Sequence, residues 1–303
     1  MSTLTKVPFE LGEPQAAGAL AVFPVLGDDA PTVYRSLSRG LKLGAFVREI
    51  HDRGSVGDVR IANAADEAIL IYEGEEIEGA RQNRSFDAHA LAPAGVELTL
   101  SVSCVERGRW DEHRRAANFA AARHAPDPDL RRTKRTRANE ASRMGQSPRA
   151  NQHEVWDAVS TRLAAHHVAS RSDALSDVFR AKGTEIEGLR KEIRHLPRQL
   201  GAIVEVSGRP VALDLTSRAD VFADLLPRLA SGYALQALHA EKVAPKKRAA
   251  YGFLTAALDA ERRWLPTPGM GDGFAVSQPG LEGSGLTVGR ELIALSAFPV
   301  GKG

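Results

Sequence analysis

Residues 74–84, with the sequence GEEIEGARQNR, gather carboxylate, amide and guanidinium groups directly after an apolar segment. Side chains such as Glu75 and Glu76 are suited to act as general bases. The guanidinium group of Arg84 presents a rigid fork of N–H donors that matches phosphate or carboxylate groups. This combination of residue types makes the segment the first candidate for a polar ligand site.

A second polar segment, residues 103–110 with the sequence SCVERGRW, also follows an apolar strand. The residues before it alternate between apolar and polar, which predicts a strand with one buried face. Extending this alternation by one step places Glu106 on the same face as Cys104. A carboxylate at the end of a buried face costs free energy unless it is paired, and the arginines of the two segments are the natural partners. Trp110 adds a flat face on which a base or a sugar stacks.

Each of these residues also has a purely structural interpretation. The glutamates of residues 74–84 fit a solvated hairpin tip, and Glu106 with Arg109 fits an ion pair that closes the sheet. Cys104 fits a buried small residue as well as a nucleophile, because a reactive thiolate needs a nearby cation. Spacing alone leaves both interpretations open.

Common catalytic and cofactor motifs are absent from the sequence, which has no P-loop, no G-x-S-x-G segment and no C-x-x-C pair. The glycines of residues 283–289 precede a strand pattern, so they predict a hairpin turn and not a dinucleotide-binding loop. His89 and His113 flank the two polar segments without a recognisable ligand spacing. The sequence therefore identifies no metal ligands, and it leaves metal dependence open and the cofactor unknown.

The elements that position these residues change in character along the chain. Residues 1–110 contain short apolar runs separated by turns, which predicts an antiparallel β sandwich or barrel that carries the candidate site. Residues 111–150 lose this pattern. From Arg107 to Arg149 there are twelve Lys or Arg residues against five Asp or Glu, a balance of +7. This segment predicts an exposed basic arm, part loop and part helix.

Residues 151–303 predict an α+β region packed on the first part. Helical periods are interrupted by a β-hairpin that turns at Ser207-Gly208, and the tail predicts two strands around a glycine-rich loop. The predicted fold class is therefore α+β, with an N-terminal antiparallel β sandwich or barrel followed by a mostly helical half with a β-hairpin.

The overall composition is that of an ordinary globular chain. The 303 residues are 43 % hydrophobic and 26 % charged, with a net charge of +2, which fits one large domain or two ordinary ones. Cys104 is the only cysteine, so an internal disulfide is excluded. The N-terminus lacks a signal-peptide pattern, and no apolar run approaches the about 20 residues of a membrane span. These features predict a soluble cytoplasmic protein with no membrane partner.

The two polar segments, together with the tripeptide PAG at residues 93–95, resemble the family called the ARG and rhodanese-phosphatase-superfamily-associated protein domain. The resemblance covers roughly residues 10–240. The family name places it beside ADP-ribosylglycohydrolase-type and phosphatase-type proteins, which implies a role with NAD-derived or ADP-ribose-like nucleotides. The candidate site residues that match its motifs are Glu75, Glu76, Gln82, Asn83, Arg84, Cys104, Glu106, Arg109 and Trp110.

Three classes of function remain. In the first, the protein binds or processes a phosphorylated nucleotide such as ADP-ribose. Arg84 and Arg109 then hold phosphate, and one of the three candidate glutamates is the general base. Gln82 and Asn83 bind ribose hydroxyl groups. In the second, the basic arm binds RNA, which its few aromatic residues disfavour. In the third, the protein is a non-catalytic scaffold that docks on a partner enzyme.

Overall fold

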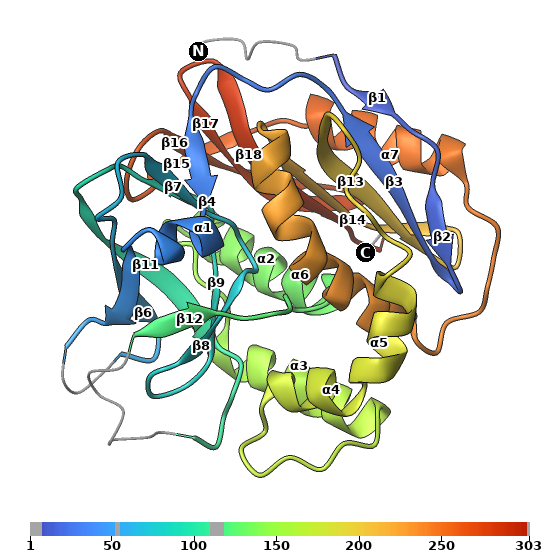
Figure 1. The fold of residues 1–303 in the computed structure, drawn as a ribbon, viewed down its shortest axis with the longest axis horizontal. Coiled ribbons are helices and arrows are strands. Elements are labelled where there is room, and N and C mark those ends of the chain that lie inside the picture. Colours follow the sequence, from blue (N-terminus) through green and yellow to red (C-terminus); the bar gives the residue numbers. More distant parts are fainter. Residues whose placement is uncertain (1–7, 52–54, 110–117, 302–303) are drawn as a thin grey trace.

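The computed structural model describes residues 8–51, 55–109 and 118–301, which form a large sheet, a closed barrel and a small sheet with helices between and around them (Figure 1). The helices are α1 (Leu37–Lys42), α2 (Pro128–Arg143), α3 (Gln152–Ala165), α4 (Leu175–Ala181), α5 (Gly183–Arg190), α6 (Ala219–Ala237) and α7 (Lys247–Asp259). None of these helices combines the length and the apolar character that crossing a membrane requires.

The large sheet has nine antiparallel strands and contains both ends of the described chain. Its strands are β1 (Glu10–Leu11), β2 (Gln15–Ala17), β3 (Leu20–Leu26), β13 (Gln199–Val206), β14 (Arg209–Thr216), β15 (Arg263–Leu265), β16 (Asp272–Gln278), β17 (Leu281–Val288) and β18 (Glu291–Pro299). Strand β3 pairs with β13, so the first strands share a sheet with the second half of the chain. The predicted hairpin joins β13 to β14. It turns at Ser207 and Gly208, whose positive φ angles of 52° and 66° are typical of a two-residue hairpin turn.

Six further strands close into a barrel that holds both polar segments. They are β5 (Phe46–Glu49), β6 (Asp58–Ala62), β8 (Glu76–Gly79), β9 (Arg84–Phe86), β11 (Glu97–Cys104) and β12 (Phe119–Ala121). The predicted alternation is present in the first part of β11, where Leu100 and Val102 are buried and Thr99 is exposed, but it ends at Ser103, which is buried like its neighbours Val102 and Cys104. A separate three-stranded sheet consists of β4 (Tyr34–Ser36), β7 (Ala68–Ile71) and β10 (Ala90–Ala92).

The α+β class and the strand-rich N-terminal part are confirmed, but the second half contains more strand than the sequence predicted. It has six strands where one hairpin and a two-stranded tail were expected. The glycine-rich residues 283–289, predicted as a turn, lie mostly inside β17. A Cβ atom at Gly283 would lie 2.7 Å from the carbonyl oxygen of Ser296, and one at Gly285 would lie 2.2 Å from the ring of Phe274. Glycine is therefore present here because neighbouring strands and rings pack closely.

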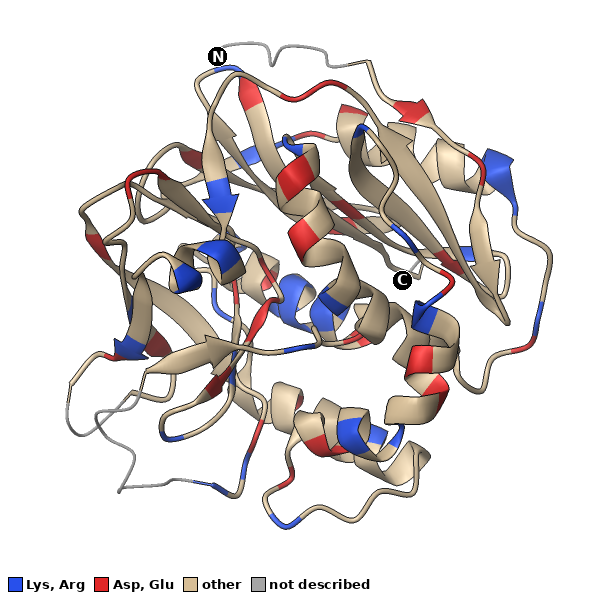
Figure 2. Ribbon diagram, viewed as in Figure 1, with Lys and Arg blue, Asp and Glu red and all other residues tan. Residues whose placement is uncertain are grey.

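The prediction of an exposed basic arm over residues 111–150 is wrong for its helical part. Helix α2 begins after Asp127, whose side chain caps it by accepting a hydrogen bond from a backbone N–H. The helix then runs through the middle of the molecule, and Figure 2 shows its basic residues at the centre of the view. Arg131, Lys134 and Arg135 follow the spacing of one helix face and are each 3 % exposed or less.

Each of these three basic residues forms an ion pair with a buried carboxylate of another element. The N–O separations are 2.6 Å for Arg131 with Asp214, 3.1 Å for Lys134 with Asp87 and 2.9 Å for Arg135 with Glu73. Lys134 also donates to the carbonyl oxygens of Ser85 and Phe86 in the barrel. The three cations therefore neutralise internal acids and join the barrel to the large sheet, so they are not available to the phosphates of a nucleic acid.

Candidate functional site

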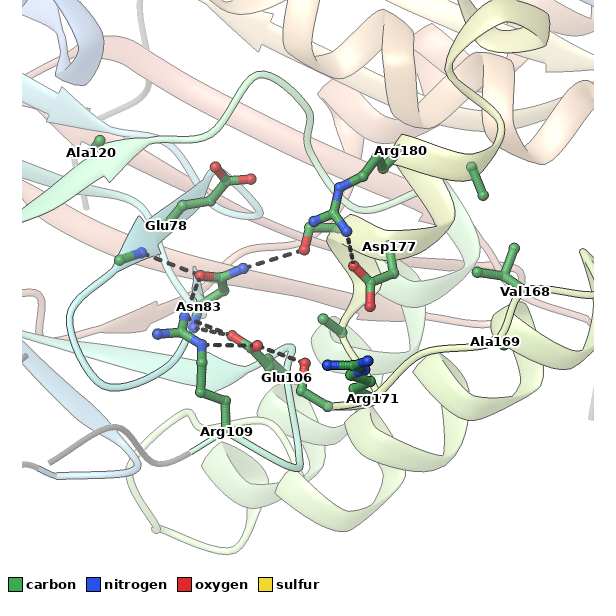
Figure 3. A pocket seen from close by; sticks show the side chains of 15 residues that line it. Glu78, Asn83, Glu106, Arg109, Ala120, Val168, Ala169, Arg171, Asp177 and Arg180 are labelled. Carbon is green, nitrogen blue, oxygen red and sulfur yellow. Dashed lines mark hydrogen bonds and ion pairs between the residues drawn. The ribbon is translucent and has the colours of Figure 1, made fainter.

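A cavity of about 810 Å³ opens between one end of the barrel and residues 168–181, which comprise the connection from α3 to α4 and helix α4 (Figure 3). The barrel side is formed by the turn between β8 and β9 and by the residues after β11. We call the opposite side the 168–181 wall. The polar residues that line the cavity are Glu78, Asn83, Glu106, Arg109, Arg171, Ser172, Ser176, Asp177 and Arg180. The volume is within the range of small-molecule sites in proteins.

The two polar segments singled out in the sequence meet at this cavity. The backbone N–H of Asn83 donates to a carboxylate oxygen of Glu106 at 3.2 Å, and the guanidinium group of Arg109 donates to the side-chain oxygen of Asn83 at 3.0 Å. Arg109 also donates to the carbonyl oxygen of Ala80 at 3.1 Å. The turn after β8 is therefore held against the residues after β11 by hydrogen bonds between the two segments.

Glu106 joins this contact to the 168–181 wall. Arg109 donates to one of its oxygens at 2.9 Å and lies 2.7 Å from the other, while the hydroxyl group of Ser172 donates at 2.8 Å. The backbone N–H of Gly108 donates to the carbonyl oxygen of Ser172 at 2.7 Å, and a Cβ atom at Gly108 would lie 2.9 Å from the Cα atom of Ser172. All three guanidinium nitrogens of Arg109 are engaged within the protein, so this ion pair positions the walls of the cavity.

Sequence reasoning missed the 168–181 wall, which presents two further arginines to the cavity (Figure 3). Arg180 pairs with Asp177 at 2.6 Å, and its side chain is 75 % exposed. Arg171 is exposed and forms no ion pair with any residue in the described part of the chain. The polar run ASRSD at residues 169–173, between two helical patterns, is the signal in the sequence that indicates such a wall.

Glu75 lies away from the cavity. It is 2 % exposed, accepts a hydrogen bond from the backbone N–H of Tyr72 at 3.0 Å and pairs with Arg228 at 3.2 Å. Burial raises the pKa of Glu75 above its usual value. A solvated hairpin tip is therefore excluded at this position, and Glu75 is an internal ion-pair partner.

Glu76 and Glu78 are two residues apart in β8, so their side chains lie on the same face of the strand. Glu76 is 1 % exposed, and burial raises its pKa. Its Oε2 atom lies 3.2 Å from Nε2 of His124, a residue that the sequence did not single out. The side chain of Glu78 is 42 % exposed and lines the cavity. Of the acidic residues in the first polar segment, Glu78 is thus the one that a bound molecule would meet.

Gln82, Arg84 and Cys104 form a separate buried cluster at β9 and β11. Arg84 is fully buried, donates to the side-chain oxygen of Gln82 at 3.0 Å and contacts the sulfur atom of Cys104. The Cys104 thiol donates to the same Gln82 oxygen at 2.7 Å. These three residues do not line the cavity, so the structure places them behind it as internal partners. Trp110 lies outside the described residues.

The environment of Cys104 argues against a nucleophile. Burial raises the pKa of its thiol to about 11, although Arg84 opposes this, so the thiol is protonated at neutral pH. We expect dithiobis(nitrobenzoate) to react with the native protein at least about 100-fold more slowly than with the protein unfolded in urea. Labelling of the native protein at the unfolded rate, followed by absorbance, would contradict this assignment.

These features define an α+β protein in which a small barrel and a helical wall enclose a polar cavity. A model of the ARG and Rhodanese-Phosphatase-superfamily-associated Protein domain matches residues 8–298. The chain therefore belongs to this family, as its two polar segments indicated. Comparison with curated proteins and with solved structures gave no match.

Proposed function

We propose that the protein binds a phosphorylated, nucleotide-like ligand of the ADP-ribose type in the cavity between the barrel and the 168–181 wall. The observation that supports this most strongly is Arg171, a guanidinium group at the cavity that has no ion-pair partner among the described residues (Figure 3). A guanidinium group suits phosphate because its N–H donors match two phosphate oxygens. The family name, which associates the domain with ARG and rhodanese-phosphatase proteins, is compatible with such a ligand.

The cavity suggests roles for several of its polar groups. Arg171 and Arg180 are placed to contact phosphate oxygens. The amide of Asn83 and the hydroxyl group of Ser176, 3.4 Å apart, are placed to bind ribose hydroxyl groups. Glu78 has a partly exposed carboxylate at the cavity and is the group best placed to accept a proton from a bound ligand. Arg109, whose three guanidinium nitrogens are all engaged within the protein, then holds the walls of the site in position.

Replacement of Arg171 with alanine is expected to weaken binding of ADP-ribose about 10- to 100-fold, because a hydrogen bond to a charged group contributes about 1.5–3 kcal/mol. Isothermal titration of the wild type and the variant with ADP-ribose, NAD and AMP measures the change. Arg209→Ala is the matched control, since Arg209 is also exposed but lies at the β13–β14 hairpin, away from the cavity. The control is expected to bind like the wild type.

Two results would contradict this proposal. One is the absence of binding heat for all three ligands at about 1 mM with the wild type, an affinity limit of about 4 kcal/mol. That result would favour the non-catalytic scaffold. The other is an unchanged affinity in Arg171→Ala, which would place the ligand elsewhere on the protein.

A further inference from the structure

Strands β8 and β12 bring three side chains of metal-ligand type together beside the cavity. Glu76 and Glu78 share one face of β8, and β12 pairs with β8 in antiparallel register, with Ala120 opposite Glu78. His124 follows β12 by three residues and turns back over the same face. One ligand atom from each of Glu76, Glu78 and His124 lies within 4.8 Å of the other two.

Two of these three residues are buried with polar atoms that lack hydrogen-bond partners. Oε1 of Glu76 accepts no hydrogen bond from the described residues, while Oε2 and Nε2 of His124 have only each other, at 3.2 Å and without well-aligned hydrogen-bond geometry. Glu76 is 1 % exposed and His124 is 7 % exposed. The imidazole ring stacks on Phe179 with ring centroids 3.9 Å apart, which holds its orientation. A buried carboxylate without donors is costly, so this arrangement calls for a cation.

A proton shared between Glu76 and His124 compensates the buried negative charge only in part. It neutralises one carboxylate and satisfies one contact, the 3.2 Å separation of Oε2 and Nε2. The other oxygen of Glu76 remains without a donor, and Glu78 adds a second negative charge with its Oε1 atom 4.0 Å from Nδ1 of His124. A divalent cation contacts both carboxylates and the imidazole at once, which a single proton does not.

The spacing of the ligand atoms suits a metal ion. With metal–ligand bonds of about 2.0–2.1 Å, the edge of a tetrahedral site is about 3.3 Å. The separation of 3.2 Å between Glu76 and His124 is already close to this edge. The Oε1 atom of Glu78 lies 4.0 Å from the other ring nitrogen, Nδ1. An ion bound at Nε2 therefore requires Glu78 to rotate toward that nitrogen, and its side chain, which is 42 % exposed, has room to do so.

We infer that Glu76, Glu78 and His124 bind one divalent first-row transition-metal ion, of the kind represented by Zn²⁺ and Mn²⁺, at the edge of the cavity. One imidazole and two carboxylates form a mixed nitrogen and oxygen ligand set, which these ions accept. Three protein ligands leave coordination positions for water or for a bound molecule, as in catalytic metal sites. Because Glu78 lines the cavity, an ion held by it would lie at the edge of the space where a ligand binds. This inference does not depend on the nature of that ligand.

The test uses metal ions alone. The full-length protein is dialysed against a chelator and then titrated with Zn²⁺ and with Mn²⁺ in a calorimeter, and visible absorption with Co²⁺ reports an inner-sphere site. We expect one ion per chain for the wild type. Glu76→Gln and His124→Gln are each expected to weaken binding at least about 100-fold, more than loss of an outer partner of a metal site does. The matched controls Glu140→Gln and His153→Gln change residues outside the cluster and are expected to bind like the wild type.

The outcomes separate clearly. Failure of the wild type to bind Zn²⁺, Mn²⁺ or Co²⁺ at about 1 mM overturns the inference, as does equal affinity in the wild type and the ligand variants. If a variant of a buried ligand does not fold, as judged by circular dichroism, Glu78→Gln replaces it because Glu78 is partly exposed. Since no nucleotide is present, failure of the nucleotide proposal leaves this result unaffected, and the reverse also holds.

Discussion

Replacing Asp214 with asparagine is expected to lower the free energy of unfolding by about 3–5 kcal/mol. Asp214 is fully buried in β14 and accepts hydrogen bonds from both terminal nitrogens of Arg131, at 2.8 and 2.6 Å. The hydroxyl group of Tyr72 donates to it at 3.0 Å, and that of Tyr233 donates as well. Removing the carboxylate charge leaves the guanidinium group of Arg131 in the interior without its counter-charge. Urea unfolding followed by circular dichroism measures the change.

A surface ion pair provides the control for this experiment. Glu187 pairs with Arg190 one turn away in α5 at 2.6 Å, and exposed pairs of this kind contribute about 1 kcal/mol at most. Glu187→Gln is therefore expected to have little effect. Adding Arg131→Met to Asp214→Asn should recover part of the loss, because the double variant has no unpaired buried charge. A loss below about 1 kcal/mol for Asp214→Asn would show that this ion pair does not stabilise α2 against the large sheet.

Acidification from pH 6.5 to 4 is expected to remove about 3 kcal/mol of stability through His89. Burial, together with the guanidinium groups of Arg135 and Arg131, lowers the pKa of His89 from 6.5 to about 4, although Glu73 opposes this. The surroundings require the neutral ring. Its Nδ1 atom accepts a hydrogen bond from the backbone N–H of Glu73 at 3.1 Å, and its Nε2 atom lies 3.3 Å from the hydroxyl oxygen of Ser296. A proton on Nδ1 would remove the first of these contacts.

The sign of the effect follows from the lowered pKa. The imidazole of His89 takes up a proton near pH 6.5 in the unfolded chain and stays neutral down to about pH 4 in the folded protein. Its stabilising contribution is therefore fully present above pH 6.5 and is lost as the pH falls to about 4. Burial raises the pKa of Glu73, but Arg135 outweighs this and lowers it to about 2, so Glu73 adds its own loss only below its unfolded value of 4.5.

The measurement compares unfolding free energies of the wild type and His89→Gln at several pH values between 6.5 and 4.5. The variant cannot take up a proton at this position, so its stability should fall less steeply as the pH is lowered. His124 does not change the slope in this window, because its contribution is constant below pH 6.5. Burial lowers the pKa of His124, but Glu76 outweighs this and raises it, so its contribution is present below pH 6.5 and lost as the pH rises. Parallel slopes in the two proteins would contradict the assignment to His89.

Local patterns in the sequence were sufficient for several parts of this protein. The period of two before Cys104 predicted β11, and Ser207-Gly208 predicted the hairpin, because strand alternation and turn conformation depend on neighbouring residues. The two polar segments also indicated the family and one side of the cavity, since Glu106 at the end of a buried face needed a nearby cation.

Other assignments depended on partners that local patterns do not reveal. The basic residues of α2 were predicted to belong to an exposed arm. In the structure, Arg131 is instead hydrogen-bonded to Asp214, which lies 83 residues further along the chain. Arg84 was predicted to bind phosphate, but it is buried beside Cys104. Conversely, Arg171 was not identified as a candidate from the sequence, although this residue lines the cavity.

The sequence by itself determined the α+β class, the strand with one buried face and the two polar segments that meet at the barrel end. The tertiary structure alone decided which charged groups face the cavity and which are buried. The reason is physical: the free energy of a charge inside a protein depends on the group that meets it. Here those groups come from distant segments, as when Ser172 reaches Glu106 across 66 residues of chain.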